Sequence, residues 1–453
     1  MERRPFTTKP IQSLHTEKRA FYLYSPEPDV WWVMVMEKPH SASTSAGTKA
    51  GSSAPLGTQS GPMEAIGREE WTDECMLVVL STMYKMYRLL HGPIADTLRG
   101  HRTEEQLAAM GAAARAALQE ACRQEAVALL RAFLPPLVIN LRWDRVDLFT
   151  TLAGVHFLPL SKNVYLALQR FVNTLENQFS RVCDTTVLYD DHLVWSGLDQ
   201  DDIRVLYKLY VAHLRAGAAD FQPMLDLGER LRSPAVRFAT GPESLTDPAA
   251  PVHELPVYTG PRAQRHQLVV YHTGLLTLLF LVRDNGDSNE GESNSTGANS
   301  AAGGGDNGPL PRTWYALLDA AITRQLAEAN LAQAVADSYR RKEAFDDQFK
   351  YIYFNRMNLA LKTSLRHKGA DVSPAVMKVL CAMHEQFAHP TDAIGEVIVK
   401  TVGDVWLVGR CSEEREFYLI FDKNKDRDVG LVDIYEHVTA LSREYFNSIF
   451  VAV

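Results

Sequence analysis

Long hydrophobic runs are absent from this sequence of 453 residues. The longest predominantly apolar stretch, residues 275–282, is far shorter than the roughly 20 residues that a membrane-spanning helix needs. The first residues are polar and carry no apolar signal segment. From these absences we expect a protein that works in the cytoplasm.

Cysteine is scarce as well, with five residues and no closely spaced pair. Scattered cysteines fit neither a disulfide framework nor a zinc site, so we expect a reducing compartment. Basic residues are not in excess, and the net charge of −8 argues against a general nucleic-acid partner. Glycine-rich phosphate-binding motifs are also missing. We therefore expect no cofactor, no metal and no catalytic residue.

The composition is that of a globular protein, with 46% hydrophobic and 23% charged residues, and the length suggests two to four domains. Residues 40–62 and 284–309 are rich in small polar residues and glycine, and we expect both to be disordered because they have little apolar surface to bury. We divide the rest into a first domain over 1–147, a second over 148–283 and a third over 310–453. The low-complexity segments can equally be loops inside domains.

Within the first domain, residues 30–36 (VWWVMVM) predict a buried strand. A helix is expected from Thr72 to about Leu90, with one apolar stripe that includes Met76, Leu80 and Tyr87. The alanine-rich segment 104–134 predicts a further helix, which Pro135 and the proline after it should end.

In the second domain, Ser161 and Asp199 are predicted helix caps. Two strands flank Asp190-Asp191, which predicts a hairpin turn, and two more strands are expected over 267–271 and 275–282.

The third domain should begin with a long helix over 314–339. We then expect strands over 350–355 and 358–365, a helix over 374–387, a three-strand meander over 397–401, 405–410 and 417–421, and a last helix over 434–446. The predicted fold class is therefore α+β, with three modules of antiparallel sheet and flanking helices.

His384-Glu385 followed by His389 resembles a zinc-protease helix. That motif needs histidines four apart, and a spacing of five rotates the second by about 140° from the first. The residues Asp422, Asn424 and Asp426 alternate like a calcium loop, but Arg427 replaces the required glycine. We favour an ordinary helix end and a charged loop.

The Asp190-Asp191-His192 group lies near Ser196 without a nucleophile-elbow sequence, so turn chemistry explains it better than hydrolysis. Basic clusters at 340–342 and 366–368 could touch anionic lipid, and a solvated charged face is the plainer interpretation. Trp31 and Trp32 are neighbours on a strand and must point to opposite faces. One of them is therefore a candidate for a partner surface.

Several blocks carry a family resemblance: KPIQSLHTEK (9–18) followed by WWVMVM, FLPLSKNVYLALQRFVN (157–173), LYDDHLVWSGLDQDDIRVLYK (188–208), RFATGPESLTDP (237–248), FKYIYFNRMNLA (349–360), EVIVKTVGDVWLVG (396–409) and EYFNSIFV (444–451). In this order the chain resembles the Ccz-one (calcium-caffeine-zinc sensitivity) family of vacuolar fusion proteins. The resemblance spans most of the sequence outside the low-complexity segments.

This resemblance implies three longin domains and a heterodimer with a second tri-longin subunit, Mon-one. It further implies that the pair is the guanine-nucleotide exchange factor for the Rab-seven GTPase and acts on phosphoinositide-bearing late endosomes, lysosomes, vacuoles and autophagosomes, with a possible third metazoan subunit. An alternative is a structural tri-longin trafficking scaffold without exchange activity.

The first longin domains are implied to form the platform for the GTPase. The residues that we expect to bind partners are therefore Leu14, His15, Thr16, Lys18 and Trp31. The family pattern has two strands and a helix ahead of the block that begins near Arg3, and this chain does not show them, so we expect the first domain to be incomplete.

Overall fold

The computed structural model describes residues 11–38, 73–100, 102, 104–140, 148–211, 236–283, 310–346, 350–365, 372–388, 395–401, 403 and 405–422. The two predicted disordered segments and the helix expected over 434–446 lie outside these residues, as do His389, Asn424, Asp426, Arg427 and the cluster at 366–368.

The first sheet is a three-strand antiparallel meander in the order β1-β2-β3, formed by β1 (Ser13–His15), β2 (Arg19–Glu27) and β3 (Val30–Glu37). Helix α1 (Asp73–His91) packs against one face of it, and the predicted apolar stripe of this helix is buried, which confirms that prediction. The predicted strand is present as β3, but the prediction that it is buried is wrong. Its side chains alternate between the core and solvent, because among the described elements α1 covers one face of the sheet.

The predicted helix over 104–134 is two helices, α3 (Glu104–Ala108) and α4 (Ala112–Asn140), with α2 (Ile94–Leu98) before them. The prediction that prolines end α4 is wrong, because Pro135 and Pro136 lie inside it. Proline removes one helical hydrogen bond and crowds the preceding turn. Phe133 and Leu137 flank the pair and are buried in the core shared with α1, and this packing offsets the cost.

The second sheet has the order β6-β5-β11-β10-β9 and is antiparallel throughout. Its strands are β5 (Val182–Tyr189), β6 (His192–Ser196), β9 (Pro256–Thr259), β10 (Gln264–Thr273) and β11 (Leu276–Arg283), and a separate short pair joins β7 (Gly241–Pro242) to β8 (Val252–His253). The predicted hairpin at Asp190 is confirmed, and Asp190 has the positive φ of 57° that this tight turn uses.

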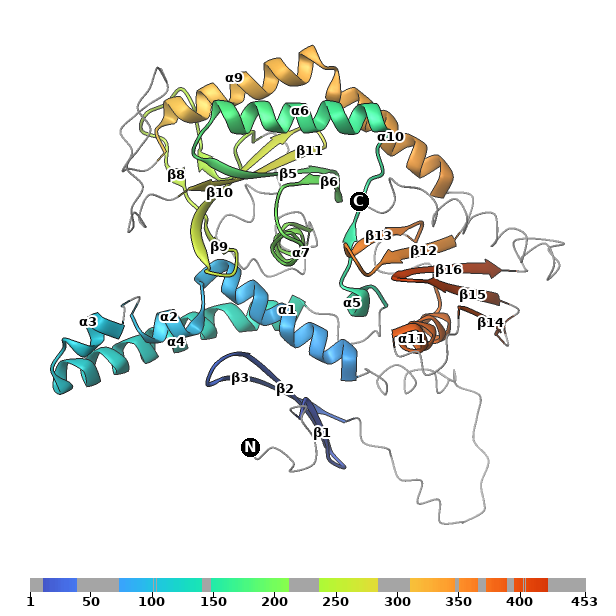
Figure 1. Ribbon diagram of the computed structural model, residues 1–453, viewed down its shortest axis with the longest axis horizontal. Coiled ribbons are helices and arrows are strands. Elements are labelled where there is room, and N and C mark those ends of the chain that lie inside the picture. Colours follow the sequence, from blue (N-terminus) through green and yellow to red (C-terminus); the bar gives the residue numbers. More distant parts are fainter. Residues whose placement is uncertain are drawn as a thin grey trace, which may run out of the picture.

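Helices cover both faces of the second sheet (Figure 1). Helix α7 (Gln200–Leu209) lies on the side of α1, and α6 (Lys162–Gln178), α9 (Arg312–Glu328) and α10 (Leu331–Asp346) lie on the other. Ser161 and Asp199 precede α6 and α7 as predicted, but neither side chain makes the capping hydrogen bond. The single helix predicted over 314–339 is wrong, since Asn330 at φ 45° separates α9 from α10.

The third sheet has the order β14-β15-β16-β12-β13-β4. It contains the predicted meander as β14 (Glu396–Lys400), β15 (Val405–Ser412) and β16 (Arg415–Asp422), together with β12 (Lys350–Asn355), β13 (Ala360–Thr363) and β4 (Val155–His156). Helices α11 (Pro374–Ala388) and α5 (Leu148–Leu152) pack on one face.

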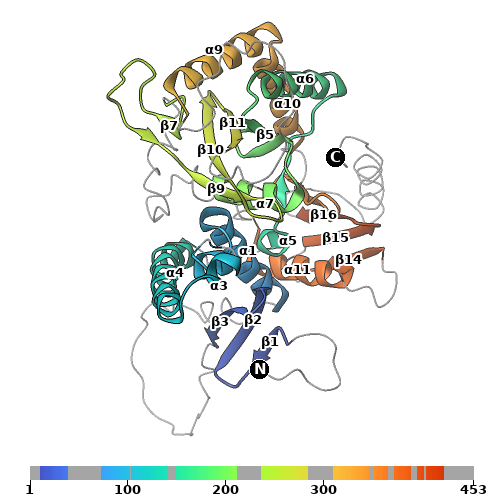
Figure 2. The same cartoon turned by 60° about the vertical axis from the view of Figure 1, so that its left-hand side comes forward.

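The second sheet (β5, β10 and β11) lies above the third (β14, β15 and β16) in Figure 2, and β4 joins the two. It pairs in parallel with β13, and the amide of Leu158 just beyond it donates to the carbonyl of Leu193 in β6 at 2.9 Å. Gly154 permits this approach, because a Cβ there would stand 2.8 Å from Leu361. The residue limits of the three predicted domains stay a prediction, and the packing adds that α9 and α10 lie on the second sheet while 148–156 lies on the third. The predicted α+β class is confirmed.

Candidate functional site

The outer face of the first sheet, opposite α1, exposes large apolar side chains. Trp31 and Val33 are each 52% exposed, Val35 is 47% exposed and Leu14 is 45% exposed. The strand register places Leu14 beside Phe21 and Phe21 beside Val35, and Trp31, Val33 and Val35 follow one another along the same side of β3. Leu23 of β2 lies beside Val33 on this side and is buried. Contiguous exposed apolar patches mark interaction sites more often than single exposed residues do. We call this surface the outer face.

Alternation along β3 explains why the outer face exists. Trp32, between the two exposed residues Trp31 and Val33, is buried against Tyr84 and Tyr87 of α1. Successive side chains of a strand point to opposite faces, so a strand that is apolar at every position must expose half of its side chains unless both faces are covered.

The free edge of β3 lies beside the outer face. The amide of Lys38 donates to the carbonyl of Lys18 at 2.8 Å, which makes these two residues a hydrogen-bonded pair of the antiparallel ladder. Such pairs recur at every second residue, so the even-numbered positions bond to β2 and the backbone groups of Trp31, Val33 and Val35 turn away from it. In the described part of the chain no strand pairs with this edge.

The five residues predicted to bind partners fall in three places. Leu14 and Trp31 lie on the outer face, towards opposite ends of it. Thr16 and Lys18 lie in the exposed turn between β1 and β2, where the hydroxyl of Thr16 donates to the carbonyl of Arg19. His15 belongs to the opposite side of the sheet. The structure does not gather all five into one cluster.

His15 and Ser13 hold β1 against the start of α1. The Nε2 atom of His15 lies 2.8 Å from Oδ1 of Asp73, and the hydroxyl of Ser13 donates to Oδ2 at 2.6 Å. Burial and the nearby carboxylate of Asp73 raise the pKa of Tyr22 to about 12. Glu27 forms a second tie at the other end of the sheet, since it accepts hydrogen bonds from the Tyr84 hydroxyl and from the amides of Ile94 and Ala95. The outer face is therefore carried by a sheet fixed at both ends.

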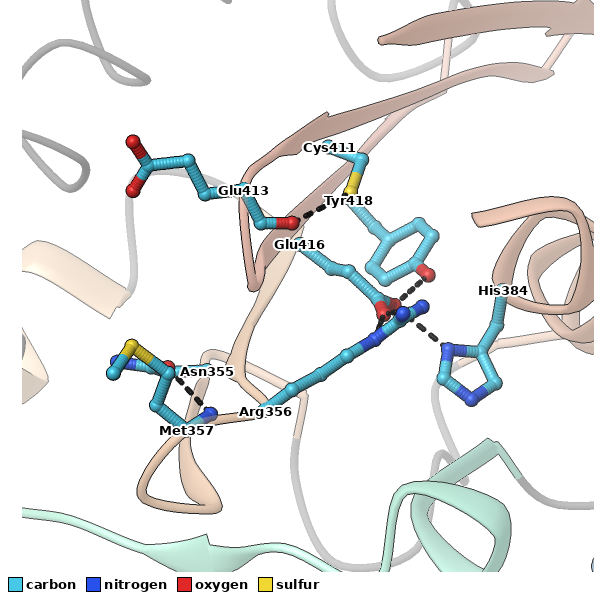
Figure 3. Close-up of polar contacts among 8 residues, drawn as sticks. All are labelled: Asn355, Arg356, Met357, His384, Cys411, Glu413, Glu416 and Tyr418. Atoms are coloured by element: carbon cyan, nitrogen blue, oxygen red, sulfur yellow. Dashed lines mark hydrogen bonds and ion pairs between the residues drawn. The ribbon is translucent and has the colours of Figure 1, made fainter. Parts of the chain in front are cut away.

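The second candidate site is a polar cluster between the third sheet and α11 (Figure 3). The carboxylate of Glu416 in β16 is fully buried and accepts hydrogen bonds from the Nε atom of Arg356, from the Tyr418 hydroxyl and from Nδ1 of His384 at 2.7 Å. Burial alone would raise the pKa of Glu416, but the hydrogen bonds from His384 and Tyr418 and the charge of Arg356 hold it below its usual value.

The Cys411 thiol lies next to this cluster (Figure 3). This thiol donates to the carbonyl of Glu413, and burial together with repulsion from Glu416 raises the pKa of Cys411. A nucleophilic thiol needs the opposite shift. Arg356, His384 and Glu416 come from the β12–β13 turn, α11 and β16, so the cluster ties three elements together.

The remaining chemical patterns have structural explanations as well. His384, the first histidine of the protease-like pattern, is hydrogen-bonded to the carboxylate of Glu416. His192 lies 2.7 Å from Asp191, whereas the Ser196 hydroxyl contacts Thr186 and the amide of Leu198, so serine and histidine do not form a nucleophile–base pair. Among the described residues no group of histidine, cysteine and acidic side chains could hold a metal, and no helix is long and apolar enough to cross a membrane.

Sequence reasoning missed Val33, Val35 and the charged cluster. A signal for the first two was present, because the exposure of one tryptophan at 31 or 32 implies the exposure of every second neighbour in the same strand. No local signal existed for the cluster, whose members are far apart in sequence.

Comparisons with known proteins agree with this architecture. A family model described as Intu longin-like domain 2 matches residues 182–299, and one described as Intu longin-like domain 3 matches residues 345–441. These models confirm the predicted multi-longin fold, with the second sheet in one match and most of the third in the other.

The chain also resembles curated proteins named vacuolar fusion protein CCZ1 homolog. It is 31% identical to the one from Nematostella vectensis, over 98% of this chain and 85% of the relative. It is 30% identical to the one from Danio rerio, over 98% and 84% of the two chains, and 26% identical to the one from Dictyostelium discoideum, over 98% and 85%. With this identity over nearly its whole length, the chain belongs to the CCZ1 family of vacuolar fusion proteins.

Proposed function

We propose that this chain acts in vesicle traffic as one subunit of a guanine-nucleotide exchange factor for a Rab-seven-type GTPase, together with the tri-longin subunit Mon-one. The chain supplies binding surface and no covalent chemistry. Its place of action is the cytoplasmic side of late endosomes, lysosomes or vacuoles, reached by peripheral contact with phosphoinositide-bearing membranes. The names of its relatives, which refer to vacuolar fusion, support this role.

The observation that carries the proposal is the outer face. Leu14, Trp31, Val33 and Val35 are exposed, whereas the other apolar strands that the structure describes are largely covered. Exchange needs no acid, base or nucleophile, because a surface that binds the nucleotide-free GTPase better than the loaded form accelerates release by that difference in affinity. An exposed tryptophan among branched apolar side chains has the composition of an interface centre.

The backbone edge of β3 supports the same surface. Partner chains commonly add a strand to an open sheet edge, with main-chain hydrogen bonds giving affinity and alternate side chains giving specificity. On β3 the residues whose backbone groups face the open edge are Trp31, Val33 and Val35, which also supply the exposed side chains.

The test measures release of a fluorescent guanine nucleotide from the GTPase by the chain co-expressed with Mon-one. We expect acceleration over the intrinsic rate, and a loss of about tenfold or more with Trp31→Ala, the range of an interface hot spot. Leu317→Ala is the matched control, because Leu317 is a similarly exposed apolar residue on α9, remote from the first sheet.

The alternative function is a structural tri-longin scaffold without exchange activity. It predicts that the two subunits co-purify and that nucleotide release stays at the intrinsic rate. Equal losses with Trp31→Ala and Leu317→Ala would contradict the assignment of the outer face even if exchange occurs.

A further inference from the structure

Strand β14 forms an open edge of the third sheet (Figure 1). The edge strand at the opposite side of this sheet is β4, and the residues directly after β4 bond to Leu193 of β6. In the described part of the chain, β14 has a partner on one side only, β15. Proteins guard open edges with proline, bulges, charged side chains or short strands, and β14 has two of these features, because it is five residues long and carries Glu396 and Lys400. Strand β14 runs from Glu396 to Lys400 without a proline and without a register shift.

The hydrogen bonds to β15 show which backbone groups point outward. The amide of Cys411 donates to the carbonyl of Gly395, and the amide of Thr401 donates to the carbonyl of Val405, each at 2.8 Å. Both contacts lie on the same register as the β14–β15 pairing, so the odd-numbered residues of β14 are its hydrogen-bonded positions. Glu396, Ile398 and Lys400 therefore turn their N–H and C=O groups towards the open edge.

The side chains divide in the same way. Val397 and Val399 pack against the third core, on the face that α11 covers. Glu396, Ile398 and Lys400 share the other face, where Ile398 is 41% exposed and the ammonium of Lys400 lies 5.5 Å from the centre of the Trp406 ring. The three residues whose backbone groups face the open edge are thus, in order, an acidic, an apolar and a basic residue.

This order is self-complementary. When two copies of β14 run antiparallel with Ile398 opposite Ile398, Glu396 of each copy faces Lys400 of the other, and Val397 faces Val399. The residues brought opposite one another at Glu396, Ile398 and Lys400 are the ones whose backbone groups are turned outward, so each pair can exchange both N–H···O bonds. Parallel pairing would instead place Glu396 against Glu396 and Lys400 against Lys400.

We propose that the open edge of β14 binds β14 of a second copy of this chain, in antiparallel register centred on Ile398. The contact is isologous, with a two-fold axis at Ile398. It extends the third sheet of each copy into one continuous sheet across the dimer. This surface lies on a different sheet from the outer face, so the proposal goes beyond the proposed exchange function and does not depend on it.

The expected dimer is weak. A single short strand on each side buries less than the roughly 1,200–2,000 Å² of a standard stable interface. Its specificity comes from register, because a shift by two residues places Ile398 opposite a charged side chain and leaves charges unpaired.

Charge exchange at the two ends of β14 tests the register. Sedimentation velocity of the full chain over a range of concentrations should show a reversible monomer–dimer equilibrium. E396K alone and K400E alone each turn two opposite-charge pairs per dimer into like-charge pairs, and each should weaken dimerisation at least about tenfold. The double variant E396K/K400E should dimerise like the unchanged chain.

Mixing the two single variants gives the sharpest result. E396K carries two positive charges along the edge and K400E two negative charges, so an equimolar mixture should form a mixed dimer more tightly than either variant dimerises alone. E328K on α9 is the matched control, because Glu328 is an exposed acid remote from β14, and it should leave the equilibrium unchanged. Circular dichroism should show the same fold for all variants.

A chain that stays monomeric across the concentration range overturns the proposal. Single variants that dimerise like the unchanged chain, or a double variant that fails to recover, overturn the proposed register. A dimer that Trp31→Ala disrupts and E396K leaves intact would assign self-association to the outer face instead. Because nucleotide release is measured separately, failure here leaves the proposed exchange function standing, and the reverse also holds.

Discussion

Strands β3 and β11 are alike in length, in apolar composition and in their position as the last strand of a meander, and they differ in what covers them. Strand β11 is buried at every residue except Arg283, has strands on both edges and has helices on both faces. Among the described elements, β3 has one strand neighbour, and α1 covers one of its faces. An apolar strand is therefore a core strand in one unit and a surface in another, because burial depends on the number of elements around it.

The largest effect that separates the two strands is on stability. Phe280→Ala in β11 removes a fully buried ring and should lower the free energy of unfolding by about 3–5 kcal/mol. Val33→Ala in β3 should change it by less than about 0.5 kcal/mol, because that side chain is half exposed. Urea unfolding followed by circular dichroism measures both. Equal losses would mean that the outer face is covered in the folded protein.

Breaking the buried charge cluster should have the next largest effect. Glu416→Gln leaves the guanidinium of Arg356 without its buried counter-charge and should cost about 3 kcal/mol in unfolding free energy. Glu413→Gln is the matched control in the adjacent turn, where the side chain is exposed, and it should cost less than about 0.5 kcal/mol. If Glu416→Gln costs no more unfolding free energy than Glu413→Gln, the stability of the third sheet and its helices does not depend on this cluster.

The same cluster predicts a dependence on pH. The pKa of Glu416 is lower in the folded than in the unfolded protein, because the hydrogen bonds and the charge of Arg356 outweigh the opposing effect of burial. Its contribution to stability is therefore complete above the unfolded pKa, about 4.5, and is lost as the pH falls through the lower folded pKa. The difference in unfolding free energy between the unchanged chain and Glu416→Gln should therefore shrink as the pH falls below about 4.5. A difference that grows on acidification would contradict the assigned direction of the shift.

Local signals predicted much of the fold. The hairpin at Asp190, the meander of β14, β15 and β16 and the apolar stripe of α1 each depend on residues close in sequence, and each is confirmed. Features set by distant residues were not predictable in the same way. Continuation of α4 through Pro135 depends on burial of its flanks against α1. The position of β4 between two sheets depends on its pairing with β13, about 200 residues away, and on the bond from Leu158 to Leu193, about 35 residues away.

The candidate site shows the same division. Exposure of Trp31 follows from alternation in one strand, whereas the position of His15 on the opposite side depends on Asp73, which lies 58 residues further along. The sequence around Glu416 gives no sign that its carboxylate is paired. Its partners, Arg356 and His384, come from two other elements and meet it only in the folded protein. Periodicity therefore predicts which face a side chain occupies, and only the fold determines its partner.

The smallest expected effects separate the residues of the first sheet by role. His15→Ala removes the contact with Asp73, and because both side chains are nearly half exposed it should cost less than about 1 kcal/mol in unfolding free energy. Trp31→Ala removes no contact with the core and should leave stability within about 0.5 kcal/mol while reducing exchange. Measuring the unfolding free energy and the rate of nucleotide release for both variants separates a structural role from a role in binding. If His15→Ala reduces exchange as strongly as Trp31→Ala with no loss of stability, the tie between β1 and α1 itself contacts the partner, and the binding surface then extends around the edge of β1 to the face that α1 covers.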